Sequence, residues 1–218
     1  MKEETNNILK AHQIYKNKDG IIVPGVTTVL SILAKPALIH WAWDLGIKGI
    51  DYRKVKDNEA NIGTLAHYLI ECDDRGIQPD ISRYSPANLD KAENAYLALL
   101  DWEKGFGEFE IVVIEQPLVC DVFGGTLDKV IKKDNEYILI DYKTSKGIYF
   151  EMKVQLSAYK YLWNFNYPER EIKTCYIFRL GKEDGSFESQ RYDDLERELS
   201  LFLSLLEVYT LKKEIENK

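Results

Sequence analysis

Two carboxylates and a lysine lie in one short stretch of this sequence, where a turn separates two apolar runs. A glycine pair leads to Asp128 and the first run, and the second run ends in Asp141, Tyr142 and Lys143. Side chains alternate between the faces of a strand, so Asp141 and Lys143 point to one side and Tyr142 to the other. Pairing of the runs as a hairpin brings Asp128 beside Asp141. Such a patch can hold a divalent metal ion, a water molecule and a phosphate oxygen, which make a hydrolytic site for phosphodiesters.

The ligand atoms of this patch suit magnesium, which prefers oxygen ligands in octahedral geometry and usually keeps several waters. Asp128 and Asp141 can supply part of that shell, and the carbonyl of Tyr142 can add another oxygen. Lys143 can orient the attacking water or stabilise charge on the phosphate. A plain hairpin with charges at its strand ends is the alternative interpretation, and the pattern alone does not decide between the two.

A histidine on a predicted helix is a further candidate ligand. His67 and Glu71 are four residues apart within the helix expected over 59–74, so they share one face. An imidazole nitrogen can bind a metal ion. A lone histidine more often has a structural role, so His67 gains weight only together with the other motifs.

A second polar pair follows the strand that carries Asp141. Gln155 and Tyr159 have the same spacing on a helix expected over 151–165, and the loop before that helix is short. Glutamine can hydrogen-bond a phosphate or a base, and tyrosine can stack on one. Taken alone, the pattern is more typical of a core helix with a solvated glutamine than of a helix that contacts nucleic acid.

The other elements are predicted from periodicity and turn residues. A hairpin is expected over 14–23, and helices are expected over 27–35, 37–56, 59–74 and 85–104. An antiparallel meander of three strands follows over 108–119, 123–133 and 136–144. The helix over 151–165 then leads to strands over 175–180 and 185–192, and to a last helix from 193. Thr27 or Thr28 is expected near the N-terminus of the first of these helices. The expected caps are Ser85 and a capping box of Asp193 with Glu196.

Length and composition fit one compact α/β domain. The chain has 218 residues, of which 45% are hydrophobic and 12% aromatic. We expect a single domain over 1–218, in which 1–105 form a hairpin and helical part and 106–218 form the sheet core and last helix. Trp41, Trp43 and Tyr52 in the helical part can line a groove that stacks bases, or pack in the core.

Several classes of protein and site are disfavoured. No apolar run is long enough for a membrane span, and the opening MKEETNNILK lacks the apolar region of a signal peptide, so we expect a cytoplasmic protein. Cys72, Cys120 and Cys175 are far apart and form no CxxC motif, which favours buried thiols over disulfides, structural zinc or an iron–sulfur cluster. The net charge of -7 argues modestly against broad nucleic-acid binding.

Four motifs in order resemble the RecB-like branch of the PD-(D/E)XK nuclease superfamily: GTLAHYLIE, GGTLDKV, LIDYKTSK and QLSAYKYL. The earlier segment VPGVTTVLSILAKPALIHWAWDLG resembles a phage and mitochondrial group that includes the mitochondrial genome maintenance exonuclease. The resemblance implies a restriction-endonuclease-like α/β fold, with a mixed central sheet flanked by helices. It also implies cleavage of DNA that depends on Mg²⁺ or Mn²⁺, commonly from single-stranded ends, and no iron–sulfur cluster.

The resemblance carries over to individual residues. The family's metal-binding and catalytic positions fall on His67, Asp128, Asp141 and Lys143, and its helix motif falls on Gln155 and Tyr159. Thr144 and Ser145 lie where the family commonly has small hydroxyl residues near the phosphate. Glu115 lies where an acidic residue is common, and we interpret it as a residue behind the metal ligands.

The leading hypothesis is a metal-dependent deoxyribonuclease, an exonuclease acting on DNA with single-stranded ends. Its expected partners are DNA and, in a phage-like setting, replication or recombination proteins. A structure-selective endonuclease is the second hypothesis. The third is a DNA-binding accessory protein of recombination or replication that kept the fold but lost the activity, against which the intact acidic residues and Lys143 argue.

Overall fold

The computed structural model describes residues 13–216. The opening segment that we interpreted as lacking a signal peptide lies outside the described residues. Within them, no helix combines the length and the apolar character that a membrane span requires.

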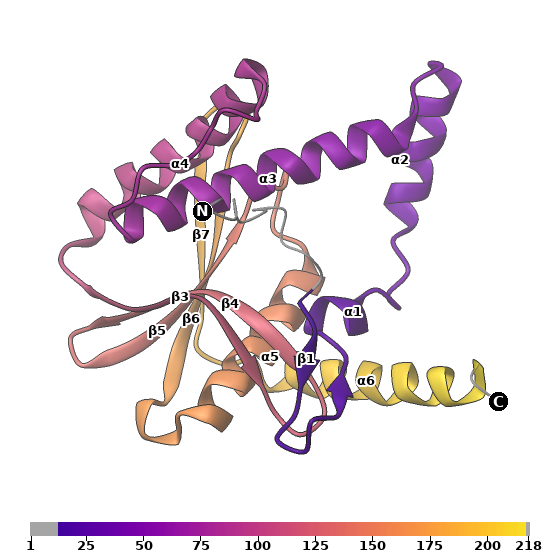
Figure 1. Ribbon diagram of the computed structural model, residues 1–218, viewed down its shortest axis with the longest axis vertical. Helices are drawn as coiled ribbons and strands as arrows, with labels where there is room; N and C mark the ends of the chain where they lie inside the picture. The colour runs from indigo at the N-terminus through magenta and orange to yellow at the C-terminus, as the bar shows by residue number, and fades with distance from the viewer. Residues whose placement is uncertain (1–12, 217–218) are drawn as a thin grey trace, which may run out of the picture.

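A five-stranded mixed sheet forms the centre of the molecule (Figure 1). Its strands, in spatial order, are β3 Glu110–Val119, β4 Gly124–Lys133, β5 Glu136–Lys143, β6 Ile172–Leu180 and β7 Phe187–Tyr192. The first three strands form the predicted antiparallel meander. β6 runs parallel to β5, and β7 is the antiparallel edge strand. The parallel pair requires a crossover, which the next helix provides.

Helices cover both faces of the sheet (Figure 1). On one face lie α1 Val26–Leu30, the crossover helix α5 Phe150–Asn166 and the last helix α6 Glu196–Glu216. On the other lie α3 Tyr52–Asp74 and α4 Pro86–Phe106. The remaining elements are α2 Pro36–Ile47, the short 3₁₀ helix η1 Pro168–Arg170, and the hairpin strands β1 Tyr15–Lys16 and β2 Ile22–Val23. This arrangement confirms the predicted α/β fold.

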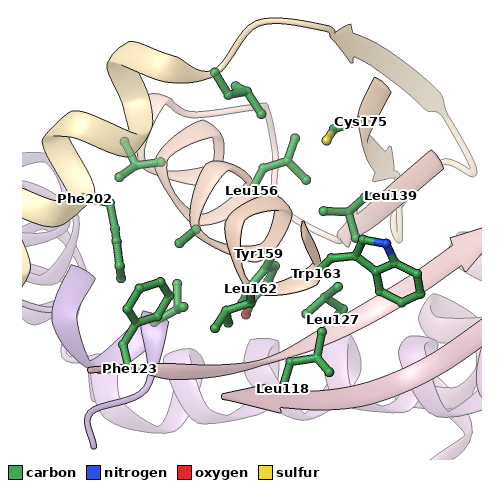
Figure 2. Packing of buried hydrophobic residues seen from close by; sticks show 14 of the residues in the cluster. Leu118, Phe123, Leu127, Leu139, Leu156, Tyr159, Leu162, Trp163, Cys175 and Phe202 are labelled. Carbon is green, nitrogen blue, oxygen red and sulfur yellow. The ribbon is translucent and has the colours of Figure 1, made fainter. Parts of the chain in front are cut away.

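Two apolar cores hold these layers together. Figure 2 shows the core on the α5 face, where Leu162 and Trp163 of the helix lie against Leu127 and Leu139 of the sheet. Phe202 of α6 closes that core from outside. The second core, between the sheet and the α3–α4 pair, contains Ile62, Leu65, Ala66, Leu99, Ile131, Ile140, Tyr142 and Phe178. The strands therefore have apolar side chains on both faces, as their near-continuous apolar runs require.

The helical segment before the sheet differs from the prediction. Instead of one helix over 37–56, the chain forms α2, turns at Gly49, where φ is 69°, and starts α3 at Tyr52. Asp51 caps α3, and its carboxylate accepts a backbone N–H two residues later at 3.0 Å. None of the described side chains of α2 is buried, and Trp43 is 69% exposed. Of the two alternatives for this helix, a position in the core is therefore wrong, and a position beside a groove stays a prediction.

The predicted caps were partly right. Ser85 caps α4 by accepting the N–H of Asn88, as expected. Gly25 is the cap residue of α1, so Thr27 and Thr28 lie near the N-terminus of this helix, as expected. The capping box predicted at Asp193 was wrong, because the Asp193 carboxylate accepts the Thr174 hydroxyl of β6 at 2.9 Å and α6 begins only at Glu196.

Candidate active site

The site forms where the hairpin strands β4 and β5 separate. Their last paired residues are Lys129 and Ile140, and Asp128 and Asp141 are the next residues beyond that pair. The backbone N–H of Tyr142 donates to Oδ2 of Asp128 at 2.8 Å. The Asp128 side chain thus accepts a hydrogen bond that a backbone carbonyl of a paired strand would otherwise accept. The prediction that strand pairing brings the two aspartates together is consistent with this register.

Asp141 is a buried carboxylate with an unusual environment. It is 1% exposed, and neither of its oxygens accepts a hydrogen bond from the part of the chain that the structure describes. The Lys143 ammonium contacts Oδ2 as an ion pair, as expected for residues on the same strand face. Burial raises the pKa of Asp141 to about 6; Lys143 opposes that rise, and the nearby Asp128 carboxylate adds to it. Oδ1 of this buried carboxylate has no hydrogen-bond partner among the described residues, which makes it suited to a bound cation.

Three ligand groups converge beside Asp141. Nδ1 of His67 lies 3.6 Å from Oδ1 of Asp128 and 3.8 Å from Oε1 of Glu115. One ligand atom from each residue lies within 4.8 Å of the others, a spacing that can accommodate a metal ion. Burial lowers the pKa of His67, but the Asp128 and Glu115 carboxylates outweigh burial and raise it above its ordinary value. A metal ion at His67 would therefore compete with a proton that these carboxylates favour.

Glu115 reaches this group through a strained backbone. It lies on β3 between residues that pair with β4, and its φ of 49° is in the left-handed region. That conformation costs a non-glycine residue about 1–2 kcal/mol. The neighbouring pairs Ile114–Lys129 and Gln116–Leu127 hold the strand in place on both sides. A strained residue at a convergence of ligand groups indicates a functional role.

Tyr142 points away from Asp141, as the strand alternation predicted. Its ring packs in the core beneath α3 and meets the His67 ring edge-on, with centroids 5.9 Å apart. Burial raises the pKa of its hydroxyl well above the ordinary value. Tyr142 therefore supports His67 with its ring and Asp128 with its backbone N–H.

The glycine pair before Asp128 is explained by two tyrosine rings. A Cβ atom at Gly124 would lie 2.5 Å from Cγ of Tyr15, and one at Gly125 would lie 2.7 Å from Cε1 of Tyr159. Tyr159 is 5% exposed, and its hydroxyl accepts a hydrogen bond of 2.8 Å from Nε2 of Gln155. The helix pair predicted from spacing therefore faces the site, with both side chains fixed.

Thr144 and Ser145 continue the strand into the wall of the site. Oγ1 of Thr144 lies so close to α3 that a Cβ atom at Gly63 would be 2.9 Å away, which explains the glycine four residues before His67. The Ser145 hydroxyl donates to the carbonyl of Gly147 at 2.8 Å, which shapes the loop that leads to α5.

All these side chains except Asp141 line one open cleft of about 1480 Å³. Its walls come from β1 and α1 on one side and from α3 on the other, with Asp128, Tyr142 and Lys143 at its floor. A second hollow of about 500 Å³ shares Thr144, Ser145, Glu59 and Lys182 with the cleft, and extends it to Trp41 of α2. A long polymer can therefore pass over the floor and continue toward α2.

Residues 38–215 match the family model of the PD-(D/E)XK nuclease superfamily. The chain belongs to this superfamily. The family is described as one of nucleases. A comparison with curated proteins gives no match.

Two solved structures resemble this member of the superfamily at low identity. "Crystal structure of SSO0001" has 19% identity and a TM-score of 0.34, and the match covers 57% of this chain and 62% of that one. This chain thus spans less than two thirds of that structure. "Crystal Structure of LHK-Exo in complex with dAMP" has 16% identity and a TM-score of 0.29, and the match covers 74% of this chain and 92% of that one.

The site of this PD-(D/E)XK protein fits a divalent metal ion, which superfamily members usually use. The observations that support the fit are the buried Asp141 carboxylate without hydrogen-bond donors and the neighbouring group of His67, Glu115 and Asp128. The carboxylate oxygens suit Mg²⁺ or Mn²⁺, and the imidazole suits transition-metal ions.

The sequence prediction underestimated one residue and missed a cluster. We interpreted Glu115 as lying behind the ligands, but it lies in the same group as His67 and Asp128. The sequence did not indicate this position, because a positive φ in the middle of a strand has no sequence signal. The missed cluster lies under the sheet, where Nζ of the fully buried Lys129 contacts Asp74 at 2.7 Å and Glu103 at 3.1 Å. A lysine among apolar strand residues was the available signal.

Proposed function

We propose that this nuclease is a metal-dependent deoxyribonuclease, an exonuclease acting on DNA with single-stranded ends. The ordered motifs favour the RecB-like branch, near the phage and mitochondrial genome maintenance exonuclease group. The observation that carries the proposal is the buried Asp141 carboxylate, paired with Lys143 and facing Asp128 at the point where the strands separate. We further propose that residues 1–218 form one nuclease domain.

The proposed ligands are His67, Asp128, Asp141 and the carbonyl of Tyr142, with Glu115 added from the geometry of the site. Bound Mg²⁺ or Mn²⁺ would lower the pKa of a water molecule and neutralise charge on the scissile phosphate. The backbone N–H of Tyr142 holds one oxygen of Asp128, which leaves the other directed to His67. The protein thereby fixes its donors before any substrate enters.

Lys143 is the proposed catalytic cation. Its ammonium is mostly buried and lies against Asp141, so it can donate a hydrogen bond to the attacking water or to a phosphate oxygen without moving far. The ion pair with Asp141 holds this ammonium group in place. Gln155, Tyr159, Thr144 and Ser145 line the cleft around Lys143 and are the proposed contacts to the DNA backbone or bases.

The arm of residues 35–56 is the proposed guide for a single strand. It carries five Lys or Arg and two Asp, a net charge of +3 in a chain of -7. Trp43 is exposed, and the rings of Trp41 and Tyr52 lie edge to face with centroids 6.5 Å apart. Exposed aromatic rings between cations favour unpaired bases and phosphates. The negative net charge of the whole chain argued against DNA binding, and the local positive charge of this arm offsets that argument.

The direct test uses end-labelled single- and double-stranded DNA with Mg²⁺, Mn²⁺ or EDTA. We expect cleavage that requires metal, and losses of at least about 100-fold in Asp141→Ala and Lys143→Ala. Glu136→Ala is the matched control, because Glu136 is exposed at the far end of the same strand and its variant should be as active as wild type. Cleavage in EDTA, or full activity in both site variants, would contradict the proposed metal-dependent nuclease.

Two further substrates separate the alternatives. A covalently closed single-stranded circle should stay intact with an exonuclease, whereas cutting of that circle would favour the structure-selective endonuclease. A gel-shift assay tests the third hypothesis. Stable DNA binding with no turnover in either metal would favour an accessory protein of recombination or replication.

A further inference from the structure

The last helix carries two apolar stripes on nearly opposite sides. The inner stripe packs on α5 and α1 and consists of Leu199, Phe202, Leu206 and Tyr209, preceded by Leu195 just before the helix. The outer stripe consists of Leu201, Val208, Leu211 and Ile215, which are 38%, 52%, 50% and 73% exposed. At 3.6 residues per turn, the centres of the two stripes are about 160° apart. The outer stripe therefore faces away from the body of the protein.

The outer stripe has the spacing of a coiled-coil seam. Positions 201, 204, 208, 211 and 215 alternate steps of three and four residues, which is the a and d pattern of a heptad repeat. All five are apolar except Ser204, whose hydroxyl donates to the carbonyl of Ser200 at 3.0 Å and so needs no other partner. An ordinary solvated helix face would carry polar residues at these positions.

We propose that α6 pairs with α6 of a second copy of this chain as a parallel two-stranded coiled coil. The residue types favour this occupant over other helices. Val208 and Ile215 are β-branched at a positions and Leu211 is at d, a combination that favours parallel dimers over higher oligomers. The a and d residues of two identical helices meet their counterparts when the helices are aligned in register, and a homodimer provides this alignment.

Charges beside the seam also match a second copy. In a parallel pair, a g position lies beside the e position five residues later on the partner helix. Here g is Glu207 and e is Lys212, so two opposite-charge pairs form across the dimer. In an antiparallel pair, g positions meet each other, and the two g residues Glu207 and Glu214 would bring like charges together.

The body of the protein favours this pairing and leaves the nuclease site open. Packing of the inner stripe on the core already stabilises α6 as a helix. Dimer formation therefore does not include helix nucleation, the unfavourable step that makes isolated short helices marginal. Figure 1 shows α6 on the far side of α5 from α3. Among the described residues that line the cleft, none belongs to α6. The proposal is therefore independent of the nuclease chemistry.

The first test measures molecular mass against protein concentration by sedimentation equilibrium. Wild type should approach twice 25.3 kDa as concentration rises. Leu211→Glu should weaken the dimer at least tenfold, and Ser204→Leu should tighten it at least tenfold. Leu203→Glu is the matched control, because Leu203 is 42% exposed on the same helix but off the seam. A single-chain mass for wild type and Ser204→Leu up to the solubility limit would overturn the proposal.

The second test determines orientation. Glu207→Lys and Lys212→Glu should each weaken the dimer, and the double variant should restore it, because the swapped charges again meet their opposites in a parallel pair. An antiparallel pair would not be restored. Under oxidised glutathione, Leu211→Cys should form a disulfide-linked dimer and Leu203→Cys should not; the native thiols are buried and do not compete. Failure of both the restoration and the selective cross-link would overturn parallel pairing, and unchanged melting temperatures would confirm that the variants fold.

Discussion

The backbone N–H of Tyr142 and the carboxylate of Asp128 are joined by a hydrogen bond of 2.8 Å across the gap between β4 and β5. The bond uses one oxygen of Asp128 and leaves the other near His67. One side chain thus closes the end of a strand pair and presents a ligand atom. Structure and proposed chemistry depend on the same carboxylate, and substitutions can separate the two contributions.

Asp128→Asn should keep the fold and lose the activity. The amide oxygen can still accept the Tyr142 N–H, but a neutral amide is a poor metal ligand. Asp128→Ala loses both roles, so it should be less stable than Asp128→Asn by about 1–3 kcal/mol. Urea denaturation without metal measures the difference, beside a nuclease assay. Equal stability of the two variants would contradict the structural role of the bond.

Asp141→Asn should make the metal-free protein more stable at pH 8 while abolishing activity. The folded-state pKa of Asp141 is raised to about 6, from an ordinary value of about 4, so the folded protein holds this proton more tightly than the unfolded chain does. Wild type therefore loses stability relative to the variant as pH rises from about 4 to about 6, by up to about 3 kcal/mol, and the deficit persists above pH 6. Unfolding experiments in EDTA from pH 4 to 8 would show whether the two curves diverge.

Mg²⁺ should stabilise wild type more at pH 8 than at pH 5. At the lower pH, protons compete for Asp141 and His67, both of which have a raised pKa. A ligand that binds only the folded state raises its melting temperature according to its affinity. Thermal unfolding with Mg²⁺ or EDTA at each pH measures the effect, and Asp141→Asn should lose most of it. An equal metal effect in wild type and variant would place the ion elsewhere.

Gly125→Ala should damage the site through Tyr159. The added methyl group would lie 2.7 Å from the Tyr159 ring, and a packed interior responds to such overfilling with a loss of about 1–3 kcal/mol. Displacement of Tyr159 also frees Gln155, so cleavage should fall with stability. Gly105→Ala is the control, since no atom lies within 4 Å of its added Cβ and alanine favours the α4 helix.

Lys129→Met should destabilise the protein by roughly 3–5 kcal/mol, because it leaves one buried and one half-buried carboxylate without their cation. Asp74 and Glu103 are 7% and 21% exposed at the side chain, and burial already raises the pKa of Asp74. Adding Asp74→Asn to Lys129→Met should recover much of the loss. If the double variant were as unstable as Lys129→Met, the cost would come from packing and not from charge.

Much of the fold follows from local pattern. The turn residues and apolar runs place β3, β4 and β5 correctly, and the i, i+4 spacing of Gln155 and Tyr159 predicts the face of α5 that meets the site. These features are local, since periodicity and turn chemistry act over a few residues. The pairing of Asp128 with Asp141 follows in turn from hairpin register.

The features that escaped prediction depend on long-range contacts. The exposure of α2 depends on where α3 begins, and the Gly49 turn that decides this lies in a segment with continuous helical character. The role of Glu115 depends on a backbone angle imposed by pairing on both sides. The Asp193 cap failed because a tertiary partner, Thr174, took the carboxylate that a local rule assigned to the helix end.

The group around His67 draws its members from three different segments of the chain. His67 comes from α3, Glu115 from β3 and Asp128 from β4, so a cation held there would join the helical half of the protein to its sheet. Such an ion would cross-link segments that are far apart in sequence. Occupancy of the site would then change the rigidity of the cleft wall, and chelation would loosen α3 above the floor of the cleft.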